Sequence, residues 1–129
     1  ETEVPSVESY RALRLGTGLS DRSPEAAKIG LLNSWHAITV KYGDEVVGMG
    51  RVIGDGGCHF QIVDVCVLPD HQGKGLAKQI MAGLISELED RAPKGAFVSL
   101  IADGDAQFLY EKFGFVLTAP GSVGMSRFT

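Results

Sequence analysis

Apolar residues along the chain fall into blocks whose spacing changes from helical to strand-like and back. Spacing of three and four residues predicts helices, and short runs rich in valine and isoleucine between glycines predict strands. The predicted elements are two helices, three strands, a helix, a strand, a short helix and two short strands, at residues 6–19, 24–32, 37–40, 46–53, 60–68, 76–90, 96–102, 106–113, 115–117 and 125–128. An antiparallel meander before a helix indicates an α+β, or mixed α/β, fold in a single domain over residues 1–129.

The segment at residues 76–90 is the clearest helix. Leu76, Ile80, Leu84 and Leu88 recur every fourth residue, which places them on one apolar face suited to packing on a sheet. The shorter helix at 24–32 has a start signal, because a serine precedes a proline at its first position.

Composition narrows the function classes. The net charge of −4 argues against a broad nucleic-acid-binding surface, and the apolar runs are too short to span a membrane. Cys58 and Cys66 form no ligand cluster with the three scattered histidines, so we expect no metal site. Few cysteines and no recognisable targeting segment favour the cytoplasm. Glycine is in excess, at 17 of 129 residues, against a usual share of about 7%.

Two glycines, Gly73 and Gly75, lie immediately before the helix at 76–90. Free backbone N–H groups and the positive end of the helix dipole favour an anion there, and glycine lets the backbone approach closely. Lys74, Lys78 and His71 add positive or titratable groups. The segment therefore indicates a phosphate site, and a tight turn with no ligand remains the alternative. The dinucleotide fingerprint fails because Lys78 stands where its third glycine belongs, and no P-loop motif is present.

The same residues match another pattern. The run Gln72-Gly73-Lys74-Gly75-Leu76-Ala77 resembles the Q/R-x-x-G-x-G/A motif of the GNAT superfamily of acyl-CoA-dependent N-acetyltransferases. The strand end at 65–69 and the run from Phe108 to Phe115 also resemble segments of that family. The resemblance covers roughly residues 6–129 and implies a twisted mixed sheet with helices on both faces. The family's first strand has no clear counterpart, and we expect it to be missing from the N-terminus.

The resemblance implies acetyl-CoA as the acyl donor. The amides of residues 73–78 would hold its pyrophosphate, and the backbone of residues 65–67 would pair with its pantetheine arm. A backbone N–H near Val67 would stabilise the oxyanion of the tetrahedral intermediate. Asp103 stands where the family often has an asparagine. In the family, a bulge often separates the strand that corresponds to residues 60–68 from the next strand, and the sequence does not show such a bulge here. The expected cofactor-binding residues are Val65, Cys66, Val67, Gln72, Gly73, Lys74, Gly75, Leu76, Ala77, Lys78, Asp103 and Tyr110.

Tyr110 matches the family tyrosine that protonates the departing thiolate. A phenol with a pKa of about 10 stays protonated at neutral pH and can donate to developing negative charge on sulfur, whose thiol has a pKa of about 8.5. The alternative role for Tyr110 is that of a packing aromatic on a short helix.

The general base is less defined. Asp64 is an acid within an apolar strand, which makes it a candidate base or anchor for the substrate ammonium, with a structural hydrogen-bonded acid as the alternative. Gln61 lies nearer the position of a glutamate found in some family members and cannot act as a base. Deprotonation through water or by the substrate is therefore a further alternative. His36 and His59 are the other candidates, each expected more often to be structural.

Three further side chains have a chemical and a structural interpretation. Cys66 suggests a covalent acyl-enzyme, but its Val-rich strand favours a buried inert thiol. Trp35 and Met125 suggest an acceptor pocket, but core packing is the favoured role for both.

The predicted function is direct transfer of an acetyl group from acetyl-CoA to a primary amine, expected to be a small molecule, in a ternary complex. The alternatives are a non-catalytic acyl-CoA-binding module and an acetyltransferase acting on protein lysines or N-termini. The domain is expected to act alone or as a homodimer, without a nucleic-acid or membrane partner.

Overall fold

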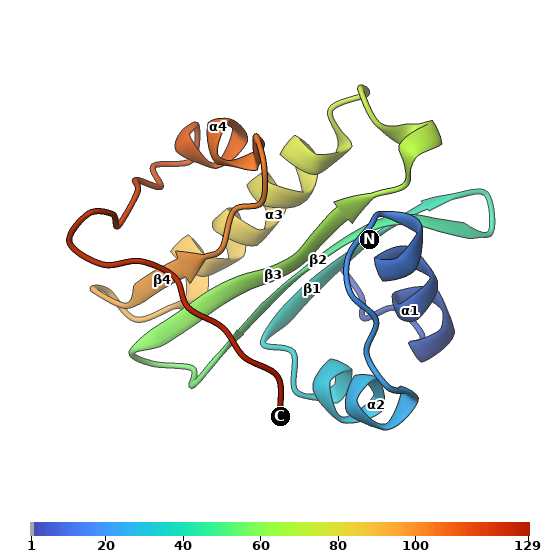
Figure 1. The fold of residues 1–129 in the computed structure, drawn as a ribbon, viewed down its shortest axis with the longest axis horizontal. Helices are drawn as coiled ribbons and strands as arrows, with labels where there is room; N and C mark the ends of the chain where they lie inside the picture. The colour runs from blue at the N-terminus through green and yellow to red at the C-terminus, as the bar shows by residue number, and fades with distance from the viewer. Residues whose placement is uncertain (1) are drawn as a thin grey trace.

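The computed structural model describes residues 2–129 (Figure 1). Two helices precede three strands along the chain, and a short 3-10 helix, a long helix, a fourth strand and a short helix follow. The elements are α1 (Val7–Gly16), α2 (Pro24–Leu32), β1 (His36–Tyr42), β2 (Glu45–Gly54), β3 (His59–Val67), η1 (Pro69–His71), α3 (Leu76–Arg91), β4 (Phe97–Leu100) and α4 (Ala106–Glu111). The α+β class is as predicted, and so is the order of the helices and strands up to α4. No helix within residues 2–129 is long and apolar enough to cross a membrane.

The four strands form one mixed sheet in the order β1-β2-β3-β4. β1 and β2 are antiparallel, β2 and β3 are antiparallel, and β3 and β4 are parallel. β4 pairs with β3 over only four positions, ending at Ile62 opposite Leu100, whereas β3 continues to Val67. Within residues 2–129, the edge of β3 that faces away from β2 therefore has no neighbouring strand beyond Ile62.

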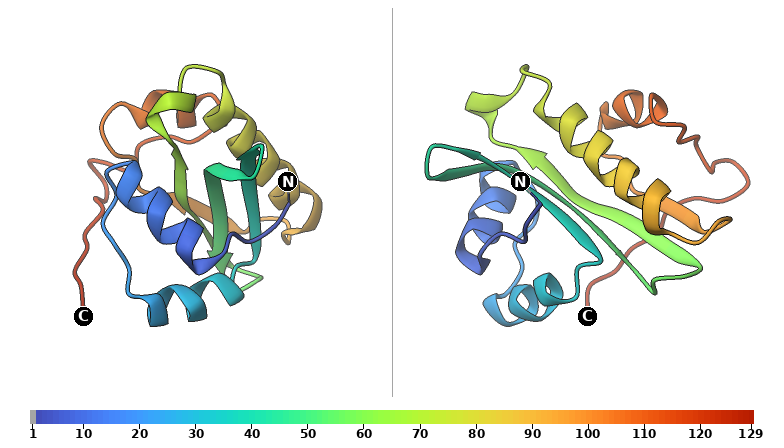
Figure 2. Two further views of the ribbon diagram at one scale, coloured as in Figure 1. Left: turned by 90° about the vertical axis from the view of Figure 1, so that its right-hand side faces the viewer. Right: turned by 180° about the vertical axis from the view of Figure 1, so that it is seen from behind.

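Helices cover both faces of this sheet, as predicted (Figure 2). On one face, Tyr10 and Leu13 of α1 and Leu31 of α2 are buried with residues of β2 and β3. On the other face, the apolar stripe of α3 packs on the sheet, and partly buried side chains of α4 join it. The buried residues of that second cluster are Val52, Phe60, Ile62, Val67, Ile80, Met81, Leu84 and Leu88.

A bulge interrupts the pairing of β2 with β3. Met49 pairs with Cys66, but Arg51 pairs with Val63, so Asp64 and Val65 lie opposite a single residue of β2. Asp64 adopts φ +60°, a left-handed conformation that non-glycine residues rarely take. A bulge of this kind bends the strand and increases its local twist. The sequence pattern did not show this feature.

The predicted strands at 115–117 and 125–128 are wrong. Within the described residues the sheet ends at β4, and the chain after α4 runs past it without pairing (Figure 1). The two apolar runs are too short to supply a core face of their own, and the glycines and proline between them disfavour a ladder. Met125 is 89% exposed, so its expected core packing is wrong as well. Trp35, by contrast, packs edge-on against Phe60 with ring centroids 4.8 Å apart.

Candidate functional site

A cleft of about 690 Å³ opens where β3 and β4 separate. Its walls come from β3, the end of β4, α4, and the segment that joins α1 to α2. Seven residues predicted from sequence to be functional line it: Asp64, Val65, Cys66, Val67, Gln72, Asp103 and Tyr110. The fold thus brings together a strand edge, a tyrosine and a carboxylate that are up to 46 residues apart in sequence.

The remaining predicted cofactor residues form the turn into α3 instead of the cleft wall. Gly73 and Gly75 both have φ +77°, and Gly75 is the N-cap of the helix. No side chain among the described residues caps α3, so its first N–H groups are available to a ligand or water. Gln72 donates from Nε2 to the Val67 carbonyl oxygen at 2.9 Å, which ties this turn to the end of β3.

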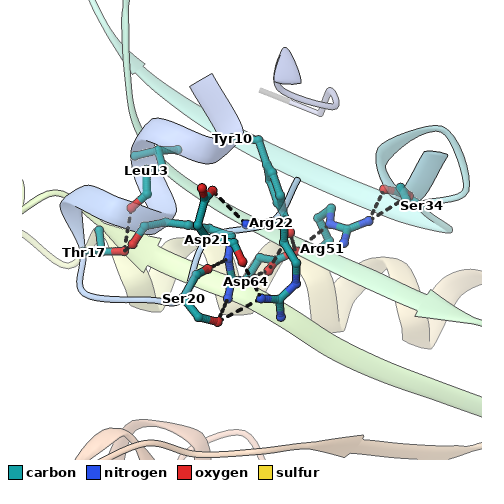
Figure 3. Close-up of polar contacts among 11 residues, drawn as sticks. Tyr10, Leu13, Thr17, Ser20, Asp21, Arg22, Ser34, Arg51 and Asp64 are labelled. Carbon is teal, nitrogen blue, oxygen red and sulfur yellow. Dashed lines mark hydrogen bonds and ion pairs between the residues drawn. The ribbon is translucent and has the colours of Figure 1, made fainter. Parts of the chain in front are cut away.

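Asp64 is held by three side chains from two other elements (Figure 3). Its Oδ1 accepts from Arg14 Nη1 at 2.5 Å, and its Oδ2 accepts from Arg51 Nε at 2.7 Å. The Tyr10 hydroxyl lies 3.1 Å from both oxygens. The side chains of these ion pairs are 5–9% exposed. Such contacts favour the structural acid among the alternatives that the sequence left open for Asp64.

The two arginines extend this cluster into the segments around it. Arg14 donates from Nε to the Ser20 carbonyl oxygen at 2.5 Å, in the loop after α1. Arg51 donates from Nη1 to the Gly30 carbonyl oxygen at 3.1 Å and to Ser34 Oγ at 2.9 Å. The cluster of Tyr10, Arg14, Arg51 and Asp64, called here the Asp64 cluster, therefore joins α1, α2 and β2 to the bulge of β3.

Three members of the Asp64 cluster, Tyr10, Arg14 and Arg51, were not predicted from the sequence. Arg51 gave a usable signal, because an arginine within an apolar strand needs an anionic partner. Arg14 and Tyr10 gave none, because both fit the ordinary pattern of an amphipathic helix. Arg22, which also lines the cleft, lies in a segment whose position relative to β3 only the tertiary structure defines.

Tyr110 is partly buried on α4. Burial raises the pKa of its phenol above the usual value of 10.0, and electrostatic interaction with Asp103 and, where its thiol ionises, Cys66 raises it further. The phenol is thus protonated at neutral pH and able to donate a proton in the cleft.

The other candidates lie in settings that suit structural roles. Burial raises the pKa of the Cys66 thiol to about 11, which disfavours the nucleophilic thiolate and supports the inert interpretation. His36 approaches Glu87 at 3.7 Å, and the His59 ring lies edge-on to Phe97. Neither histidine lines the cleft.

Comparison with known proteins agrees with this geometry. The model of a family described as the acetyltransferase (GNAT) domain matches residues 19–124. A probable acetyltransferase of unknown function from Staphylococcus aureus, SA2161, has a TM-score of 0.95 and 43% identity, over 100% of this chain and 97% of its own. An uncharacterized N-acetyltransferase, ycf52, of Pyropia yezoensis is 33% identical over 84% of this chain.

The histone acetyltransferase TAP1 of Glycine max is 32% identical over 74% of this chain and 43% of its own length. The chain spans 63% of the length of the Pyropia protein. The family model covers most of the sequence, and the fold has the separated strands and uncapped helix described above. The chain belongs to the GNAT family of acetyltransferases.

Proposed function

We propose that the chain transfers an acetyl group from acetyl-CoA to the primary amine of a small molecule, by direct attack in the cleft. The observation that carries the proposal is the separation of β3 from β4 beyond Ile62, beside Tyr110. A free strand edge supplies backbone donors and acceptors for an extended ligand, and an adjacent phenol supplies a proton.

The residues of the chain fit the donor. The free edge of β3 from Val63 to Val67 offers backbone groups for the pantetheine amides, and the turn at Gly73–Gly75 offers N–H groups for the pyrophosphate. Bound acetyl-CoA supplies the thioester whose acetyl carbon is attacked. We assign an N–H near Val67, two residues beyond the bulge, to the developing oxyanion.

Proton transfers are assigned to different groups. Tyr110 donates a proton to the sulfur as the thiolate leaves, because its raised pKa keeps the phenol protonated. Both oxygens of Asp64 are engaged by guanidinium groups, so we assign it the role of holding the bulge and not that of base. The amine then loses its proton to water or to a group of the substrate itself.

A small acceptor is favoured because it must share the cleft with the pantetheine arm of the donor. The cleft volume of about 690 Å³ lies within the range of pockets for small molecules, about 300–1,000 Å³. Acetylation of protein lysines or N-termini is the second candidate, supported by the histone acetyltransferase among the relatives.

The decisive experiment is a panel of amine acceptors assayed with acetyl-CoA by release of free thiol. Small amines and lysine-containing peptides are compared under the same conditions. We expect turnover with at least one small amine and a lower kcat/KM with peptides. Acetyl-CoA binding without thiol release from any acceptor would support a non-catalytic binding module and contradict the proposal.

A second prediction tests the assigned cofactor site. Gly75→Glu is expected to weaken acetyl-CoA binding by at least about tenfold, because it brings a negative charge next to the phosphates and strains a left-handed position. Gly95→Glu is the matched control. Gly95 also has a positive φ and open space around it, but it lies beyond the other end of α3, away from the assigned phosphate site. Calorimetry measures both affinities, and an equal effect of the two substitutions would refute the assignment.

A further inference from the structure

Two arginine side chains, those of Arg14 and Arg22, line the cleft of a chain whose net charge is −4. Arg14 and Arg51 share a single carboxylate, that of Asp64. The loop after α1 contributes the guanidinium group of Arg22 to the cleft. On the opposite side Asp103 contributes one negative charge. The Asp64 carboxylate is thus already shared by two arginines, and Arg22 is the remaining guanidinium group of the cleft lining.

Arg22 is the member of this group whose charge is not neutralised. Its Nη1 donates to Ser20 Oγ at 2.8 Å and to the Asp21 carbonyl oxygen at 3.1 Å, both uncharged acceptors (Figure 3). The neighbouring carboxylate of Asp21 is engaged by Arg11 at 2.8 Å. No ion pair involving Arg22 occurs within the part of the chain that the structure describes.

The surroundings of Arg22 suit a small anion. The Phe128 ring lies 5.7 Å from its guanidinium carbon, so the aromatic side chain covers one face of the planar group. Other N–H groups of Arg22 remain for a ligand, since a guanidinium has five N–H donors and the bonds to Ser20 and Asp21 both use Nη1. A carboxylate or phosphate matches such a fork through two parallel hydrogen bonds.

We propose that the acceptor is a small amine that also carries an anionic group, and that Arg22 binds this group. The inference rests on the proposed acetyl transfer and specifies its substrate class. The chemistry shared by suitable acceptors is a carboxylate, as in an amino acid, or a phosphate ester, as in a phosphorylated amino sugar.

The test uses matched pairs of acceptors that differ in the anion. An amino acid is compared with its amide, and a phosphorylated amino sugar with the unphosphorylated sugar, each by kcat/KM with saturating acetyl-CoA. We expect the anionic member of at least one pair to be preferred by at least about tenfold, as for a charge-assisted hydrogen bond of ordinary strength. The pair that shows the preference distinguishes a carboxylate from a phosphate.

Arg22→Gln is the diagnostic variant, and Lys28→Gln, which removes one exposed positive charge from α2 outside the cleft, is its matched control. We expect Arg22→Gln to raise KM for the anionic acceptor and to leave kcat/KM for its neutral partner within about twofold, whereas Lys28→Gln keeps the preference. Added salt should also reduce the preference of the wild-type protein. A preference that survives in Arg22→Gln would overturn the proposal.

Binding of the N-acetylated products, measured by calorimetry, separates this inference from the proposed reaction. The acetylated amino acid should bind more tightly than its acetylated amide, and Arg22→Gln should remove the difference. That result in a protein without turnover would support the anion site and contradict acetyl transfer. Equal binding of both products, and likewise of the phosphorylated and unphosphorylated pair, would overturn the anion site even in an active enzyme.

Discussion

Replacement of Asp64 by alanine is expected to lower the free energy of unfolding by about 3–5 kcal/mol, because removal of one partner leaves buried guanidinium groups without their anion. The side chains of Arg14 and Arg51 are only 7% and 9% exposed, so water cannot fully replace the carboxylate. The expected loss is a large part of the stability of a typical domain, about 5–15 kcal/mol. Urea unfolding followed by circular dichroism measures it.

Further substitutions at Asp64 separate charge from backbone conformation. Asp64→Gly removes the same carboxylate but adopts φ +60° without strain, so the difference between glycine and alanine reports the backbone. Asp64→Asn tolerates the left-handed region and keeps one acceptor oxygen, and we expect the smallest loss. Asp21→Ala breaks the exposed pair with Arg11 and serves as the control, with little expected change. A loss in Asp64→Ala no larger than in this control would contradict a structural role for the Asp64 cluster.

Replacement of Tyr110 by phenylalanine is expected to lower kcat by about 100-fold or more, the usual contribution of a positioned general acid. The ring and its packing on α4 are retained, so KM for acetyl-CoA and the stability should change little. Tyr42→Phe, at an exposed tyrosine of the β1–β2 hairpin, is the matched control. Unchanged turnover in Tyr110→Phe with a good acceptor would show that Tyr110 is not the acid.

The pH profile adds an independent check on Tyr110. Its pKa is raised above 10.0, chiefly by burial, so the proton that it donates is retained through neutral and moderately alkaline pH. As pH rises through the raised pKa the phenol ionises and the acid is lost. We therefore expect the alkaline decline of kcat in the wild-type protein to lie above pH 10, and to be absent from the residual activity of Tyr110→Phe.

The local pattern of the sequence was sufficient for the elements that position the donor. The four-residue repeat from Leu76 to Leu88 predicted α3, since a helix buries one face wherever apolar residues recur at its period. The glycines at 73 and 75 predicted a turn with free amides before this helix, and both adopt the positive φ that glycine takes readily. These features depend on residues only a few positions apart, so the local sequence is sufficient to predict them.

The two terminal strands show where local pattern fails. Residues 115–117 and 125–128 are apolar, but a strand forms only where another strand accepts its hydrogen bonds. In the described chain the sheet ends at β4, and Val116 and Phe128 remain exposed. Pairing of this kind is decided by the arrangement of the whole sheet, and short apolar runs carry no information about it.

By itself, then, the sequence determined an α+β domain, its central helix and the turn with free amides, and it singled out Tyr110 and Asp64 as polar groups of interest. Only the tertiary structure decided what Asp64 contacts, because its partners Tyr10, Arg14 and Arg51 are 54, 50 and 13 residues away. The same holds for the bulge and for Arg22, whose place in the cleft depends on how α1 and α2 pack on the sheet. Charges at such separations meet only after the chain has folded, since long-range packing and not local propensity sets their distances.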